Sequence, residues 1–199
     1  AWSYKDLDHP ITPFAGVIDQ LSNDFGVSLR NDYTGNFLGH KNNFTLGFTP
    51  TWGYVSDSRY VNNFGSRGAK FADTDQFALN LDAYALEQFW ITPQWAALAG
   101  LQVNYVERTS TDNFPTGPDN SDSQNWWGFS PKLGVLYQPV EQVQFYADAS
   151  RSFEPPTFGE LVEASDGQVG LVQLDAQTGT TVEIGTRGRF KHITWDLCY

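Results

Sequence analysis

The chain has 199 residues and a formal net charge of −11, with seven Trp, nine Tyr and fifteen Phe. The acidic balance argues against nucleic acid as a partner, because phosphate binding needs a basic surface. No run approaches the roughly 20 apolar residues of a membrane helix. The single cysteine, Cys198, excludes an internal disulfide.

Apolar residues recur with a period of two along most of the chain, which is typical of β-strands with two different faces. In the fourth segment, for example, Trp95, Leu101 and Tyr105 share one parity while Gln102 and Asn104 lie on the other. We predict eight strands. Their approximate ranges are Asp24–Tyr33, Asn43–Trp52, Phe77–Ala83, Trp95–Tyr105, Phe129–Gln138, Val143–Phe153, Thr180–Phe190 and Ile193–Tyr199.

Short and long connections alternate between these strands. The long polar ones are predicted over Ser56–Thr74, Arg108–Trp126 and Glu154–Gly179, and the first 23 residues would end another long loop. A compact soluble domain rarely has several structureless loops of this length. A transmembrane β-barrel has short periplasmic turns and long extracellular loops by construction. The short connections are Gly35–Lys41, Thr92–Gln94, Pro139–Glu141 and Lys191–His192.

The predicted strands satisfy the main requirement of a lipid environment. Hydrocarbon offers the backbone no hydrogen bonds, so each strand must pair with a neighbour, and alternation then turns apolar residues to lipid and polar residues to the lumen. Arg30, Asp32, Glu183 and Arg187 are expected lumen residues. Aromatic residues near strand ends fit the girdles found at membrane interfaces. The alternative, a sandwich core, does not explain the alternating loops.

Three stretches in order resemble TonB-dependent outer-membrane receptors. They are Leu81–Tyr105, with its Thr92-Pro93 turn and Ala99-Gly100-Leu101; Phe129–Pro156, with Ser130-Pro131-Lys132-Leu133-Gly134; and Thr181–Gly188, with Glu183-Ile184-Gly185. Gln102 stands where the family commonly has Arg. The resemblance covers about Leu81–Tyr199 and is weaker from Asp24 onward.

The resemblance implies an all-β fold, an antiparallel transmembrane β-barrel segment with about eight of the family's 22 strands. Residues 1–199 would be a partial barrel domain, with the plug domain and the terminal strands absent. The expected setting is the outer membrane of a Gram-negative bacterium. The implied partners are outer-membrane lipid, a ferric siderophore or similar scarce nutrient, and the TonB complex through the missing plug region. The implied activity is transport, without enzymatic chemistry or a cofactor.

Neither a catalytic constellation nor a metal site is expected. His9, His40 and His192 lie far apart, and no nucleophile or phosphate-loop motif is present. The candidate ligand-binding residues are instead arginines and aromatics of the long loops, because ferric siderophores are commonly anionic. They are Arg59, Tyr60, Arg67 and Lys70 in the first loop, Arg108, Trp126 and Trp127 in the second, and Arg151 at the third.

Two other hypotheses remain open at this point. Eight strands can close into a complete small barrel with a structural or adhesion role. A soluble β-sandwich that binds carbohydrate is a third class. Solvated loop charges are also the ordinary explanation for any one of the candidate residues.

Overall fold

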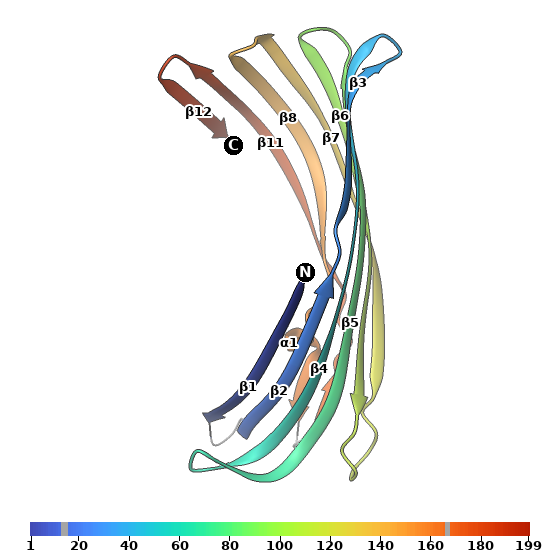
Figure 1. Cartoon of the computed structure of the whole chain (residues 1–199), viewed down its shortest axis with the longest axis vertical. Coiled ribbons are helices and arrows are strands. Elements are labelled where there is room, and N and C mark those ends of the chain that lie inside the picture. The colour runs from blue at the N-terminus through green and yellow to red at the C-terminus, as the bar shows by residue number, and fades with distance from the viewer. Residues whose placement is uncertain (13–15, 166–167) are drawn as a thin grey trace.

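The computed structural model describes residues 1–12, 16–165 and 168–199, and it is dominated by one antiparallel sheet (Figure 1). Most strands of this sheet that follow one another in sequence are hydrogen-bonded neighbours, so the chain runs as a meander. A short second sheet and one helical turn lie in the connection between β8 and β11. The elements are β1 (Trp2–Thr12), β2 (Gly16–Gly26), β3 (Leu29–Phe37), β4 (His40–Asn63), β5 (Ser66–Trp90), β6 (Trp95–Asp112), β7 (Asp122–Val140), β8 (Val143–Glu154), α1 (Phe158–Leu161), β9 (Val162–Ser165), β10 (Gln168–Leu171), β11 (Gln177–Phe190) and β12 (Ile193–Cys198).

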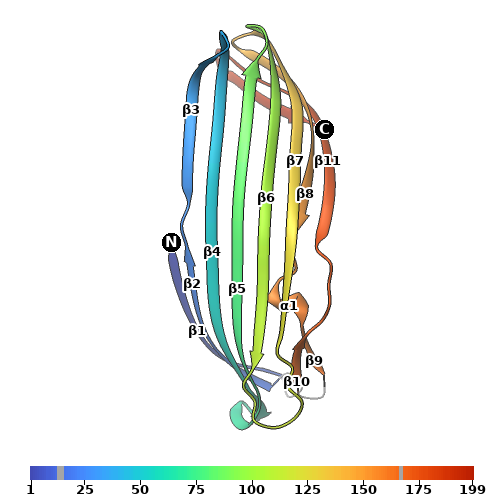
Figure 2. The same ribbon diagram turned by 90° about the vertical axis from the view of Figure 1, so that its right-hand side faces the viewer.

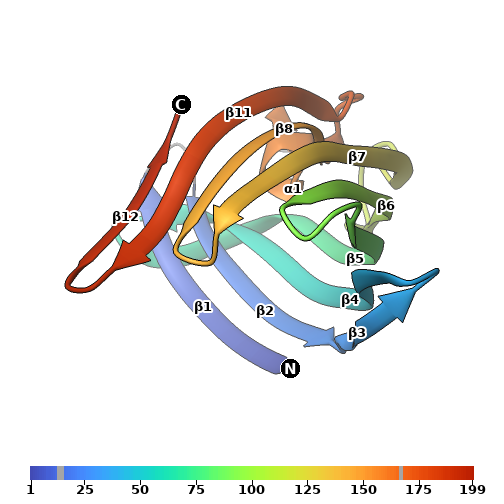
Figure 3. The ribbon, with the colours of Figure 1, turned by 90° about the horizontal axis from the view of Figure 1, so that it is seen from above.

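The sheet is strongly curved and open. Figures 1 and 3 show a trough, with α1 inside it and the strands forming its wall. The strand order begins at β1 and ends at β12, and within the described residues these two strands do not pair with each other. The hypothesis of a complete small barrel is therefore not favoured. None of the helices described is long and apolar enough to cross a membrane.

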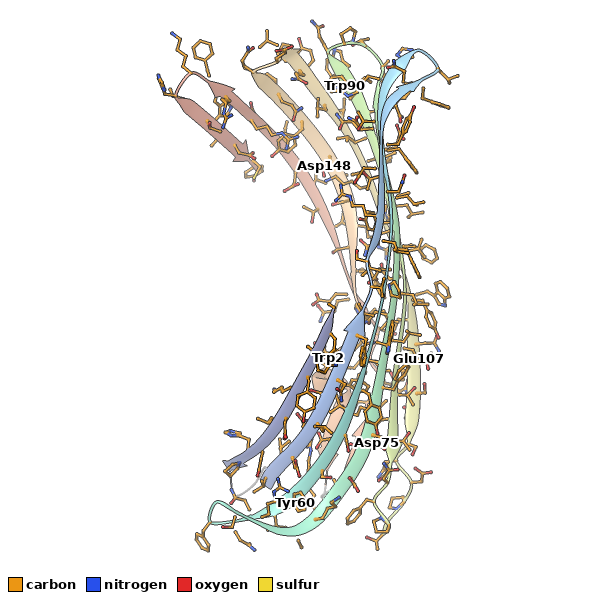
Figure 4. The ribbon with its side chains drawn as sticks, viewed as in Figure 1. Trp2, Tyr60, Asp75, Trp90, Glu107 and Asp148 are labelled. Carbon is orange, nitrogen blue, oxygen red and sulfur yellow. The ribbon has the colours of Figure 1, made fainter. Side chains whose placement is uncertain are left out.

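The pairing register gives the trough two chemically different faces, since cross-strand partners point to the same side. Leu46, Ala85 and Leu101 form one row, which lies on the convex face. The adjacent row contains Tyr84 and Gln102 and lies on the concave face. Large exposed apolar side chains follow the first parity, whereas the buried polar side chains of β5, β6 and β7 follow the second. Figure 4 shows side chains on both faces, with Glu107 on the outer side.

Aromatic pairs mark two levels on the convex face. Trp95 stacks on Tyr137 near the short turns, with ring centroids 4.4 Å apart, and Tyr105 meets Trp127 further along the same strands at 5.0 Å. About ten residues of β6 separate the two levels. At about 3.3 Å per residue and a tilt of about 40°, they span roughly 25 Å, the height of a lipid-facing band. The sequence-based expectation of aromatic girdles agrees with this geometry.

β4 to β7 continue well beyond the outer aromatic level. β4 and β5 remain paired from Asn42 to Asn63, with irregularities near Tyr60, and turn at Phe64–Gly65. Both turn residues have positive φ, which glycine accepts without strain. The prediction of a structureless loop over Ser56–Thr74 is therefore wrong, because this segment is a strand extension that is polar on both faces.

The N-terminal region also differs from the prediction. Residues 1–23 were expected to end a long loop, but β1 and β2 pair over nearly their whole length. β2 and β3 line up along β4 as one interrupted strand, broken at Val27–Ser28. The eight predicted strands thus correspond to the sheet positions from β2/β3 to β12, and β1 adds a further edge.

Candidate functional site

Three candidates of the first predicted loop, Tyr60, Arg67 and Lys70, form one cluster at the tip of the β4–β5 hairpin, where the long connections gather (Figure 2). The Arg67 guanidinium lies 5.1 Å from the centre of the Tyr60 ring, and the Lys70 ammonium lies 5.7 Å from it. Arg59 precedes Tyr60 on β4 and contacts Asp57 instead. The structure therefore brings together three of the four residues that the sequence had grouped.

Carboxylates of β1, β2 and β5 balance the charge of this tip cluster. Arg67 forms ion pairs with Asp8 of β1 at 2.9 Å and Asp19 of β2 at 2.7 Å. Lys70 pairs with Asp73 at 2.9 Å. The hydrogen bond to Asp8 raises the pKa of Arg67, and the one to Asp73 raises the pKa of Lys70, so both cations are held protonated.

Arg59 is also paired, in a more buried setting. Its guanidinium lies 3.4 Å from the carboxylate of Asp57, which is only 2% exposed. The amide of Gln20 donates a second hydrogen bond to Asp57 at 2.7 Å. The tip is therefore a charge-compensated cluster in which cations are held in place by acids, and not the basic patch expected from local sequence.

Trp126 and Trp127, grouped by the sequence analysis, point to opposite faces of β7. Trp127 packs against Tyr105 in a tilted arrangement on the convex face, within the outer aromatic level. Trp126 lies on the concave face and donates its indole N–H to the carbonyl of Leu174 at 3.0 Å. Adjacent residues of a strand must diverge in this way, so these two do not share one site.

Arg108 also lies on the concave face, in the extension of β6 above the outer aromatic level. It is 9% exposed and donates to the carbonyls of Leu79 and Glu107 and to the amide oxygen of Asn80, at 3.3, 2.9 and 2.9 Å. Burial lowers the pKa of its guanidinium. No carboxylate lies within 4.0 Å of it among the side chains that the structure describes.

Parts of the connection between β8 and β11 that the structure describes lie against the concave wall beside Arg108. Two parts of it, residues 157–161 and 172–174, are here named the docked flanks. Leu161 is fully buried, and Phe158 lies 5.9 Å from the Arg108 guanidinium. Gln124 of β7 donates to the carbonyl of Val172 at 3.0 Å. The sequence analysis missed Gln124 and Leu161, although the parity of β7 places Gln124 with Trp126.

Arg151 stands apart from both groups. It is exposed on β8, just beyond Ser150, the last residue that pairs with β7. Its position near the base of the third connection agrees with its predicted place, and no contact in the described part of the chain joins it to Arg108 or to the tip cluster. Within the same described residues, no three His, Cys, Asp or Glu side chains gather as a metal site.

The expected lumen residues share the concave face. Arg30 forms a two-pronged ion pair with Asp32, at 2.8 Å for the closest atoms. Glu183 is opposite Asp148, whose carboxylate lies 2.7 Å from Lys132, and Arg187 donates to Gln144. An apolar, aromatic-bounded outside and a polar, ion-paired inside define the wall of a transmembrane β-barrel.

The comparisons with known proteins give the family. The model of the TonB-dependent receptor-like β-barrel matches residues 2–197, and the chain belongs to this family. TonB-dependent receptors are outer-membrane transporters, not enzymes. The metal-pseudopaline receptor CntO of Pseudomonas aeruginosa is 28% identical over 131 residues, which are 60% of this chain and 18% of CntO.

Solved structures of receptors share the fold. The siderophore receptor PiuA from Acinetobacter baumannii superposes with a TM-score of 0.69 at 17% identity, over 88% of this chain and 30% of PiuA. The pyoverdine receptor FpvA from Pseudomonas aeruginosa, bound to pyoverdine, gives 0.59 at 19% identity, over 88% of this chain and 26% of FpvA. The chain thus spans less than a third of these relatives.

Proposed function

We propose that this chain forms part of the barrel wall of an outer-membrane transporter that takes up a metal ion as an organic chelate, in the first instance a ferric siderophore. The observation that carries the proposal is the two-faced wall: an apolar band about 25 Å high faces outward and ion-paired polar side chains face the trough. CntO, PiuA and FpvA are named for metal chelates or siderophores, which supports this substrate class.

The proposed partners are outer-membrane lipid, the chelate and the TonB complex. Outer-membrane lipid would cover the convex face between the two aromatic levels. The chelate would enter at the end that carries the long connections, where the tip cluster, Arg108 and Arg151 lie. Energy would come from the TonB complex through a plug region of the parent protein, with residues 1–199 as part of its barrel domain. Binding and passage need no covalent chemistry.

Uptake by the full-length parent tests the proposal. Cells that express the parent in a receptor-deficient Gram-negative strain would be given ⁵⁵Fe as ferric citrate, a ferric tris-catecholate, a ferric pyoverdine or ferrioxamine B. We expect energy-dependent accumulation of at least one chelate, abolished by a protonophore and by deletion of TonB. Failure to accumulate any of them, with the receptor correctly inserted, would contradict the proposed substrate class.

The tip cluster has its own test. Replacing Arg59 and Arg67 together by alanine is expected to weaken binding of that chelate, because two cations would leave the entrance. Arg189→Ala is the matched control, since Arg189 lies beside the short turn between β11 and β12 at the opposite end. If the double variant binds as the parent does, these arginines only hold the β1–β2 hairpin in place.

A further inference from the structure

The concave face of the strand extensions carries a buried floor of polar side chains. Gln76 pairs with Ser110 across β5 and β6, and Arg108 pairs with Gln124 across β6 and β7. With Thr74 they are all buried. An ordinary sheet surface that serves only as a docking platform would be apolar, because burying polar groups is costly unless each finds a partner.

Two groups of this floor lack the partner that burial normally requires. Arg108 is a buried cation whose contacts are neutral oxygens and the Phe158 ring, with no described carboxylate near it. The hydroxyl of Ser110 is 1% exposed and has no hydrogen-bond partner among the residues that the structure describes. Arg59, a few residues from the β4–β5 turn, shows the contrast, since it is held by the buried Asp57.

The docked flanks cover this floor and use its donors. The amide of Gln124 donates to the carbonyl of Val172 at 3.0 Å and to the carboxylate of Asp122 at 3.3 Å, and the face of Arg108 is covered by Phe158. Figure 3 shows α1 on the concave side of the wall. The flanks thus set one carbonyl oxygen and one aromatic face against floor donors that also suit an anion.

We propose that Arg108, Ser110 and Gln124 form a binding site for anionic oxygen groups of the transported chelate, and that the docked flanks occupy this site until the ligand displaces them. The inference rests on the proposed function and specifies its substrate as an anionic chelate, with carboxylate or catecholate oxygens. Arg108 supplies the charge, and the amide and hydroxyl supply hydrogen bonds. Displacement by the ligand exchanges the Val172 carbonyl on Gln124 and the Phe158 ring on Arg108 for charge-assisted hydrogen bonds, which are about twice as strong as neutral ones.

The test measures equilibrium binding of ferric citrate, a ferric tris-catecholate, a ferric pyoverdine and cationic ferrioxamine B to the full-length parent in detergent micelles. Arg108→Gln should weaken binding of the anionic chelate about tenfold or more, by loss of a charge-assisted contact. Arg30→Gln is the matched control, because Arg30 lies on the same face but is already paired with Asp32; it should leave affinity unchanged.

Phe158→Ala is expected to change the affinity for the anionic chelate in the opposite direction to Arg108→Gln. Removing the ring that covers Arg108 should weaken docking of the flanks and tighten binding of the anionic chelate several-fold. If the flanks were instead part of the ligand site, the same variant would weaken binding. Unchanged affinity of Arg108→Gln, or weaker binding by Phe158→Ala, overturns the inference.

The ligand panel separates this inference from the proposed function. Binding of ferrioxamine B alone would overturn the anionic site and leave chelate transport standing. Binding of none of the four chelates would overturn both. Binding of an anionic chelate with the expected pair of opposite effects supports both.

Discussion

Replacing Leu101 with arginine tests whether the convex face of the sheet meets lipid. Leu101 lies on β6 and is 45% exposed on the convex face. Its neighbour Gln102 lies at the same depth on the concave face. Leu101→Arg and Gln102→Arg therefore introduce the same charge at one level of the wall, on opposite sides. Thr109→Arg adds a third position, on the convex face but beyond the outer aromatic level.

The expected magnitude follows from depth. Leu101 is four residues from Tyr105, which at about 3.3 Å per residue and a tilt of about 40° places it roughly 10 Å below the outer aromatic level. In a band of about 25 Å, this is close to the midplane. An arginine facing lipid at that depth costs about 2–4 kcal/mol, whereas near an interface it costs about 0–1 kcal/mol. Leu101→Arg should thus lower the folding equilibrium constant roughly 30- to 700-fold.

Folding of the full-length parent into phosphatidylcholine vesicles across a urea series measures this difference. The folded fraction can be followed by the heat-dependent mobility of the barrel on gels. We expect Leu101→Arg to fold at distinctly lower urea than the parent, and Gln102→Arg and Thr109→Arg to remain close to it. Equal behaviour of the Leu101 and Gln102 variants would refute the assignment of the two faces.

Three further predictions concern local features of the wall. Trp126→Phe removes the hydrogen bond to the 172–174 flank, so amide exchange in that flank should rise about 2- to 10-fold, whereas Trp127→Phe should leave it unchanged. Glu160 accepts hydrogen bonds from the backbone and side chain of Thr157, which hold its pKa below the usual 4.5. Protection of α1 should therefore be full above pH 4.5 and fall as the pH drops through the lower folded value, and Glu160→Gln should remove this dependence. Leu136→Ala opens the apolar cluster near the short turns and should destabilise the parent in the same urea assay by about 2–5 kcal/mol.

The part of the fold within the aromatic band was predictable from sequence. There, one face must be apolar and the other polar, so the chain shows period two, and the family resemblance could be found from the same stretches. Leu101 and Gln102 illustrate this: adjacent residues of opposite character, on opposite faces. The antiparallel sheet and its two faces are confirmed by the pairing register, and the eight predicted ranges fall within a sheet that has further strands.

The strand extensions were not predictable by that route. Above the outer aromatic level both faces are polar, so hydrophobic alternation disappears while backbone pairing continues. Polar residues such as Ser56, Ser58 and Asp73 therefore led to the prediction of a loop. The same loss of signal hid β1 and β2, whose carboxylates Asp8 and Asp19 compensate Arg67. A local basic patch was expected because acids distant in sequence are not visible in a local count of charge.

The sequence indicated which region of the wall holds the candidate residues, but it predicted less accurately which of them lie together. Tyr60, Arg67 and Lys70 do meet, because they flank one tight turn, whereas Arg59 pairs with Asp57. Their role as ligand-binding residues, with that of Arg108, Trp126, Trp127 and Arg151, stays a prediction. Trp126 and Trp127 could have been separated by strand parity alone.

The long pairing of β4 with β5, which runs from the short-turn end to the outer tip with irregularities near Tyr60, has a mechanical consequence. A pull along the axis of the trough is inclined by about 40° to these strands, so its larger component loads their hydrogen bonds in shear, all at once. A pull across the strands would open them one after another, at far lower force. A wall built in this way can keep its shape while material beside it is drawn along the axis.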